Sequence, residues 1–171
     1  MARGAFVYRT ESIDAESANP IDVLHAVAIE NGWPFEEHGG DEIILSMRGK
    51  YADYRVFFTW MQPLEVFHVA CVFDLTVPEP RRTELQRLVA CINEQLWFGH
   101  FDLWTPDGTV LFREALLLVG GVTASAHQCE VLLGTALDSC ERYYPAFQWV
   151  LVDRSASDAI AAVSIEAAGE A

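Results

Sequence analysis

Residues 65–77 read Glu-Val-Phe-His-Val-Ala-Cys-Val-Phe-Asp-Leu-Thr-Val, and this stretch decides the fold class. One set of alternate positions is wholly apolar: Phe67, Val69, Cys71, Phe73 and Leu75. Because alternate side chains on a strand share a face, this set predicts a long strand with one face in the core. The opposite set, Val66, His68, Ala70, Val72 and Asp74, is half apolar. A strand covered on one side needs no such residues, so the pattern predicts burial on both sides.

Shorter strand patterns lie on either side of this stretch. Residues 33–38 and 42–48 flank Gly39-Gly40, and an aromatic-rich run follows at 53–62. Residues 100–105 and 109–119 flank Pro106-Asp107-Gly108, a sequence typical of a tight turn, which predicts a hairpin.

Three segments have helical spacing. The first begins with Asn19 as cap and Pro20 in the first turn, and Gly32 ends it. The second begins at Pro80 or Arg81, after the strand has ended at Pro78. Ser125 and Gln128 predict a capping box for the third. Its apolar stripe is Cys129, Leu132, Leu133, Ala136, Leu137, Cys140, Tyr144 and Phe147, and we expect Pro145 to kink or restart it.

The resulting order is α-β-β-β-β-α-β-β-α, which predicts an α+β fold. We expect residues 1–18 to form a flexible leader and residues 19–152 to form the domain. Residues 153–171 then form a short C-terminal helix and tail, with a helix that starts at Ser155–Asp158.

Charge and composition restrict the partners. The chain has 11 basic and 25 acidic residues, a formal net charge of −14, and a single Lys. Phosphate backbones and anionic lipid surfaces attract Lys and Arg, so we expect neither nucleic acid nor membrane as partner. No export signal is visible, and Cys71, Cys91, Cys129 and Cys140 form no CxxC pair. These features predict reduced core cysteines in a cytoplasmic protein.

The chain resembles the YbjN family of bacterial sensory-transduction regulators over roughly residues 20–152. The resemblance is carried by residues 93–96 (Asn-Glu-Gln-Leu), 99–103 (Gly-His-Phe-Asp-Leu), 117–121 (Leu-Leu-Val-Gly-Gly) and 141–147 (Glu-Arg-Tyr-Tyr-Pro-Ala-Phe). The resemblance implies a fold like that of class I type III secretion chaperones, in which an antiparallel sheet is flanked by helices. It also implies self-association as a dimer and no catalytic residues.

No pattern in the chain has the residues of an active site. Cys71 and His68 fall on opposite faces of one strand and cannot meet, as a Cys-His nucleophile would require. His100 and Asp102 share a strand face, a spacing more typical of a surface pair than of a metal site. Gly120-Gly121 before the third helix favours a turn over an anion site, since no phosphate-binding Lys motif accompanies it. We expect no cofactor and no metal.

The surplus of apolar residues on the strands and the third helix favours a non-enzymatic, homodimeric protein-binding module with a regulatory or chaperone-like role. Its expected partners are a second copy and an unidentified protein. The candidate contact surface is Val66, His68, Ala70, Val72, Trp60 and Tyr54. An alternative is a small-ligand sensor with an aromatic pocket walled by Trp60, Tyr54 or Trp104. A further alternative is a cysteine hydrolase that uses Cys71, Cys91 or Cys140.

Overall fold

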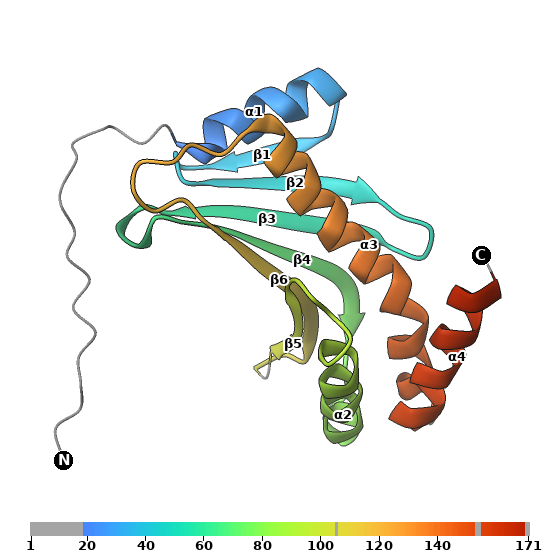
Figure 1. Cartoon of the computed structure of the whole chain (residues 1–171). Helices are drawn as coiled ribbons and strands as arrows, with labels where there is room; N and C mark the ends of the chain where they lie inside the picture. The colour runs from blue at the N-terminus through green and yellow to red at the C-terminus, as the bar shows by residue number, and fades with distance from the viewer. Residues whose placement is uncertain (1–18, 105, 153–154, 170–171) are drawn as a thin grey trace, which may run out of the picture.

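The structure is a computed structural model and describes residues 19–104, 106–152 and 155–169. Its helices and strands follow the expected order, and α4 begins where the short C-terminal helix was expected (Figure 1). The elements are α1 (Pro20–Asn31), β1 (Phe35–His38), β2 (Glu42–Arg48), β3 (Asp53–Met61), β4 (Val66–Thr76), α2 (Arg82–Asn93), β5 (His100–Trp104), β6 (Thr109–Leu117), α3 (Ala126–Leu151) and α4 (Ala156–Gly169). The expected leader, residues 1–18, lies outside the described residues.

Local sequence signals set several of these boundaries. The Asn19 side chain accepts a hydrogen bond from the Ile21 N–H, and Gly32 ends α1 in the left-handed conformation with φ 67°. Ser125 and Gln128 form the predicted capping box of α3. The helix continues without a break through Pro145, so the expected restart does not occur. Buried Tyr144, Ala146 and Phe147 anchor the helix in the core around the proline.

The six strands form one antiparallel sheet in the order β1-β2-β3-β4-β6-β5. The long β4 lies at its centre, between β3 and β6. The β4–β6 register shifts between Val72 and Thr76, so β4 bulges and bends there. Within the hairpin of β5 and β6, it is β6 that pairs with β4, so β5 forms one edge of the sheet.

The core lies between one face of this sheet and the helices. Phe67, Val69, Cys71, Phe73 and Leu75, the apolar set predicted from β4, are all buried. α3 crosses this face diagonally, α1 packs on α3, β2 and β3, and α2 packs on β5 and α3. α4 packs on α2 and α3, with Ala156 and Ala159 buried, so it joins the body of the molecule.

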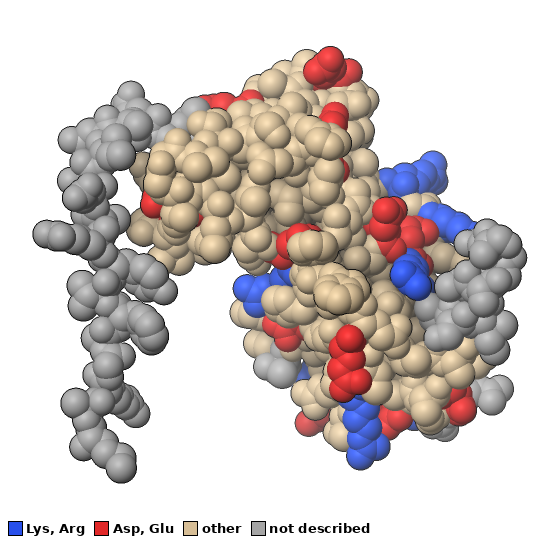
Figure 2. Space-filling view, in the orientation of Figure 1, with Lys and Arg blue, Asp and Glu red and all other residues tan. Residues whose placement is uncertain are grey.

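Figure 2 shows the helix-covered side of the molecule. Its upper left part, over α1 and the first half of α3, is almost free of Lys and Arg, which lie toward the right and below. Exposed apolar side chains in these elements and in the segment before α3 include Ile29, Val119, Val122 and Val131.

Candidate functional site on the open face of the sheet

The opposite face of the sheet carries no helix in the part of the chain that the structure describes. We call it the open face. Strand register places its side chains in rows across the sheet. The rows are Ser46, Arg55, Val72, Leu111 and Asp102; Ile44, Phe57, Ala70, Arg113 and His100; Glu42, Thr59, His68 and Ala115; and Met61, Val66 and Leu117.

The apolar side chains of this face lie mostly on its central strands. Phe57, Val66, Ala70 and Val72 are half-buried, and Ile44 is buried, although all five point away from the helices. Leu117 and Trp104 are exposed on β6 and β5. The single chain therefore leaves the second face of β4 only partly covered, whereas the sequence predicted burial on both sides.

A polar chain crosses the same face from β5 to β4. Arg113 of β6 donates to Asp102 at 3.4 Å and to Nε2 of His68 at 3.3 Å. His68 accepts this bond with a neutral imidazole. Burial, together with nearby Arg113 and His100, lowers the pKa of His68. The arrangement fixes side-chain positions across three strands, and it contains no nucleophile.

Four of the six residues predicted as a contact surface come together on the open face: Val66, His68, Ala70 and Val72. The other two do not. Tyr54 and Trp60 are 1% and 5% exposed and point into the core, because their positions on β3 align with Phe73 and Phe67 of the buried β4 set. The inclusion of Tyr54 and Trp60 was wrong, since side chains beneath the helices cannot contact a partner.

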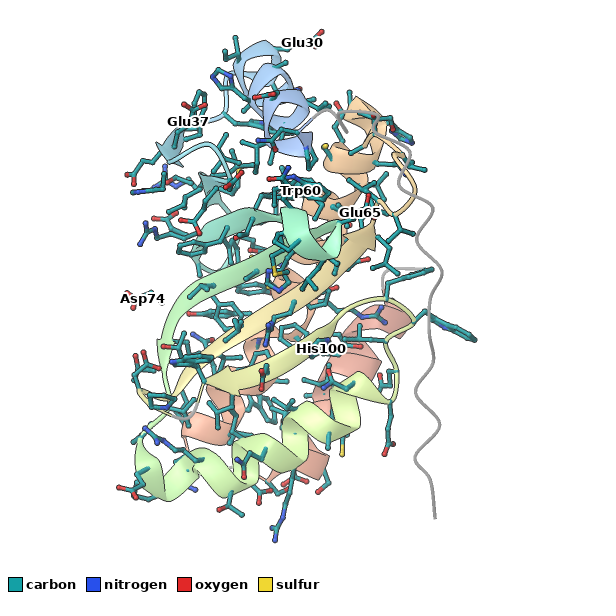
Figure 3. The ribbon with its side chains drawn as sticks, turned by 90° about the vertical axis from the view of Figure 1, so that its left-hand side faces the viewer. Glu30, Glu37, Trp60, Glu65, Asp74 and His100 are labelled. Atoms are coloured by element: carbon teal, nitrogen blue, oxygen red, sulfur yellow. The ribbon has the colours of Figure 1, made fainter. Side chains whose placement is uncertain are left out.

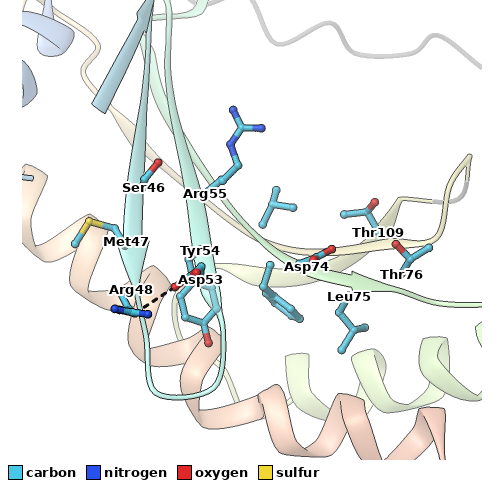
Figure 4. A pocket seen from close by; sticks show the side chains of 12 residues that line it. Ser46, Met47, Arg48, Asp53, Tyr54, Arg55, Asp74, Leu75, Thr76 and Thr109 are labelled. Carbon is cyan, nitrogen blue, oxygen red and sulfur yellow. Dashed lines mark ion pairs between the residues drawn. The ribbon is translucent and has the colours of Figure 1, made fainter. Parts of the chain in front are cut away.

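The aromatic residues considered as the walls of a ligand pocket do not lie together. Trp104 lies on the open face, whereas Trp60 is enclosed in the core. A cleft of about 600 Å³ lies where β4 bends away from β3 (Figure 4). Tyr54 lines it together with charged side chains from both strands, among them Arg48, Asp53, Arg55 and Asp74. Phe73, Val72 and Leu75 also line it, so the cleft combines charged side chains with an apolar wall that contains two aromatic rings.

The cysteines are unpaired in the structure. Cys71, Cys129 and Cys140 are buried as predicted, but Cys91 is exposed on α2, which corrects its assignment to the core. Burial raises the pKa of the Cys129 thiol to about 11 and raises that of Cys140 well above its ordinary value. Thiols held in this state are poor nucleophiles.

The structure also places the candidate metal pair, His100 and Asp102, and the candidate anion site at Gly120-Gly121. Asp102 is held by Arg113, and no group of three or more metal-ligating side chains occurs among the described residues. Gly120 and Gly121 both have positive φ and form a turn, and the capping box engages the N–H groups of Ser125 and Gln128. No helix within the described ranges is long and apolar enough to cross a membrane.

Sequence reasoning missed the contributions of β3 and β6 to the open face, chiefly Phe57, Leu111, Arg113 and Leu117. The alternation of residues 109–117 shows which side chains of β6 share a face of the strand. The sequence does not show, however, that β6 rather than β5 pairs with β4, and only that pairing places Arg113 beside His68.

A family model for YbjN, described as "Putative bacterial sensory transduction regulator", matches residues 20–149. The chain belongs to the YbjN family. The match covers well over half of the chain and includes every strand of the sheet. No curated protein matches the chain.

A solved relative supports the same fold. It is described as "Crystal structure of YbjN, a putative transcription regulator from E. coli", and it aligns with a TM-score of 0.54 at 10% sequence identity. The alignment covers 71% of this chain and 85% of that one. At this identity the likeness establishes the YbjN fold in this chain and leaves its molecular activity to be argued from its surface.

Proposed function

We propose that this YbjN-family protein is a non-enzymatic regulatory module that forms a homodimer and binds protein through the open face. The observation that carries the proposal is an uncovered sheet face whose central strands present apolar side chains. Such a face is typical of a surface that another polypeptide covers.

The charges on this face favour a second copy as its occupant. The whole chain carries −14, which opposes self-association in general. On the open face, however, Arg113 is paired with Asp102 at 3.4 Å and Arg55 lies 4.0 Å from Glu36. Two copies can therefore approach through this face with little charge repulsion. A two-fold interface places the same apolar strands of both copies against each other.

The proposal extends to location and chemistry. Four unpaired cysteines, one of them exposed, support a cytoplasmic protein, where thiols stay reduced. The His68–Arg113–Asp102 chain and the buried thiols support a binding role without catalysis. We propose no cofactor.

Sedimentation equilibrium of the full chain across the micromolar range tests the dimer. We expect the wild type to be dimeric and Val72→Glu, which places a carboxylate on the central strand of the open face, to be monomeric. Gln86→Glu on the exposed side of α2 adds the same charge elsewhere and should stay dimeric. A wild type that remains monomeric throughout, or a Val72→Glu variant that dimerises like the control, would overturn the proposal.

A small-ligand sensor is the second candidate, and the 600 Å³ cleft at the β4 bulge favours it. Its guanidinium and carboxylate groups suit a small polar ligand that carries both charges. A thermal-shift series with free amino acids and nucleotides tests this, because a ligand that binds only the folded state raises Tm. The absence of any shift at millimolar concentrations would exclude these compounds.

A further inference from the structure

Strand β6 continues beyond the point where its neighbour β5 begins, so part of its outer edge has no described strand beside it. The β5–β6 pairing begins with His100 opposite Arg113, whereas β6 continues to Leu117. We call residues 115–117 the free edge. Figure 3 shows this stretch of the sheet between His100 and Glu65.

The free edge directs hydrogen-bonding groups of its main chain outward. The Leu118 N–H donates to the Glu65 carbonyl at 2.8 Å, on the β4 side of β6. Because these groups alternate in direction along an antiparallel strand, the N–H and C=O groups of Ala115 and Leu117 point away from β4. No described main-chain group bonds with them. They are therefore open to an added strand.

The chain itself closes one end of the free edge. Gly99 directly precedes the His100–Arg113 pair, and its φ of +64° turns the chain at this point. A Cβ at Gly99 would overlap the Phe112 ring and lie 2.9 Å from the Arg113 carbonyl oxygen, so Gly99 packs directly against β6. An added strand can pair with the free edge, but it cannot continue toward Arg113. A polypeptide whose chain ends at this point fits the edge.

Basic side chains lie at the closed end. Arg113 is opposite the exposed His100, and it donates to His68 at 3.3 Å and to Asp102 at 3.4 Å. A guanidinium has more N–H donors than these two bonds use, and the Arg113 side chain is 39% exposed. Arg113 can therefore donate to an anion that arrives along the free edge.

The acidic groups near the closed end leave this approach open. Asp102 is the partner of Arg113 and lies on β5, beyond His100. Glu114 lines the groove beside the edge, but it is paired with buried Val69 on the helix-covered side of the sheet, and its Oε2 is shielded from solvent. Burial raises the pKa of Glu114, which favours the neutral carboxyl.

Exposed apolar side chains border the free edge. A groove of about 500 Å³ lies beside it, lined by Trp97 and Phe98 together with the basic side chains. Trp97 is 94% exposed, Phe98 is 71% exposed, and Leu117 on the edge itself is 66% exposed. Apolar side chains of an added strand would cover these groups, while its main chain pairs with the edge.

We propose that the free edge of β6 binds the C-terminal tail of a partner protein as an antiparallel strand, with the terminal carboxylate of the tail at Arg113 and His100. In this direction the last residue of the tail pairs with Ala115, and the third residue from its end pairs with Leu117. A parallel strand would bring the other end of the segment toward the basic side chains. The site is separate from the central strands that the proposed dimer uses, so either proposal can fail without the other.

An NMR titration of the isotope-labelled full chain tests the site. The probe is an acetylated hexapeptide of alternating threonine and valine that ends in valine with a free carboxylate, and its matched control is the same peptide with a C-terminal amide. We expect the acid to shift the amide signals of Ala115, Leu117 and His100. It should bind roughly tenfold more tightly than the amide, because only the acid forms charge-assisted hydrogen bonds with Arg113.

Two variants assign the carboxylate contact. Arg113→Gln should remove most of the difference between acid and amide, because glutamine carries no charge. Its affinity for the amide peptide should equal that of the wild type, which shows that the edge is intact. Arg48→Gln makes the same charge change on β2, where the side chain is 92% exposed, and should bind the acid as the wild type does.

The opposite results are equally specific. Unchanged signals at Ala115 and Leu117 with millimolar acid would overturn the proposal, and so would equal binding of acid and amide. Equal weakening by Arg113→Gln and Arg48→Gln would assign the effect to net charge and would also overturn it. Shifts centred on Phe57 and Val72 would place the peptide on the open face instead. Val72→Glu should bind the acid like the wild type, which separates this result from the dimer experiment.

Discussion

The side-chain amide of Asn93 forms two hydrogen bonds with the main chain of Phe101. Its Nδ2 donates to the Phe101 carbonyl at 3.0 Å, and the Phe101 N–H donates to its Oδ1 at 2.8 Å. Asn93 is the last residue of α2, and Phe101 lies on the edge strand β5. The amide therefore replaces a neighbouring strand at this position, and the helix end closes the edge of β5.

Replacing this amide should lower stability without changing side-chain size. Asn93→Leu leaves two main-chain groups of Phe101 without partners, and we expect a loss of about 2 kcal/mol in the free energy of unfolding. Urea denaturation followed by circular dichroism measures it. Asn93→Asp keeps the acceptor for the Phe101 N–H and should lose less. Equal stability of the Leu variant and the wild type would show that water satisfies both groups.

A second prediction concerns the turn between β2 and β3. The Glu141 carboxylate of α3 accepts a hydrogen bond from the Lys50 N–H at 2.9 Å. A Cβ at Gly49 would collide with this carboxylate and with the Tyr54 ring. Gly49→Ala should therefore cost about 2 kcal/mol through overpacking, measured by thermal or urea unfolding.

Gly134→Ala is the matched control, because a Cβ there meets nothing within 4 Å. It lies inside α3, where alanine is favoured over glycine by about 0.5–1 kcal/mol. We expect this variant to gain stability. If both alanine variants gained stability, the contact of Glu141 with the turn would not constrain Gly49.

Stability should depend on pH through His68. Burial, followed by Arg113 and His100, lowers the pKa of His68 in the folded state. The unfolded chain then binds the proton more readily, so stability falls as pH decreases below the ordinary histidine pKa of about 6.5. Above that pH the difference disappears. Asp102, which pairs with Arg113, is the acidic group of this chain of contacts.

The measurement compares unfolding at neutral pH with unfolding in the mildly acid range. His68→Gln keeps an acceptor for Arg113 and cannot take up a proton, so its loss of stability on acidification should be smaller than that of the wild type. His127→Gln, on the exposed face of α3, should lose as much as the wild type. Parallel curves for the wild type and His68→Gln would contradict the assignment.

Sequence patterns predicted the elements well where local chemistry determines them. The alternation in β4, the Asn19 and Ser125 caps and the Gly32 terminus all depend on neighbouring residues, and the structure confirms each. Tyr54 and Trp60 show the limit of this reasoning. Their alternation indicated one shared face, but only the pairing of β3 with β4 shows that this face lies beneath the helices.

The open face depends on contacts between distant segments. Arg113 reaches His68 across 45 positions of sequence because β6 inserts between β4 and β5. Periodicity fixes which side chains share a face of one strand, but strand order and strand length relative to a neighbour come from packing of the whole sheet.

The last prediction concerns thiol reactivity and tests the cysteine hydrolase alternative. Ellman's reagent should label Cys91 rapidly in the folded protein, because it is the exposed cysteine, and should label Cys71, Cys129 and Cys140 only on unfolding. Cys91→Ser should abolish the fast phase. The raised pKa values of Cys129 and Cys140 keep these thiols protonated at neutral pH, and burial shields Cys71. A second fast phase in Cys91→Ser would reveal an activated thiol and revive the hydrolase. If Cys91 on the surface of α2 is the single thiol that reacts rapidly, a binding role remains the better explanation.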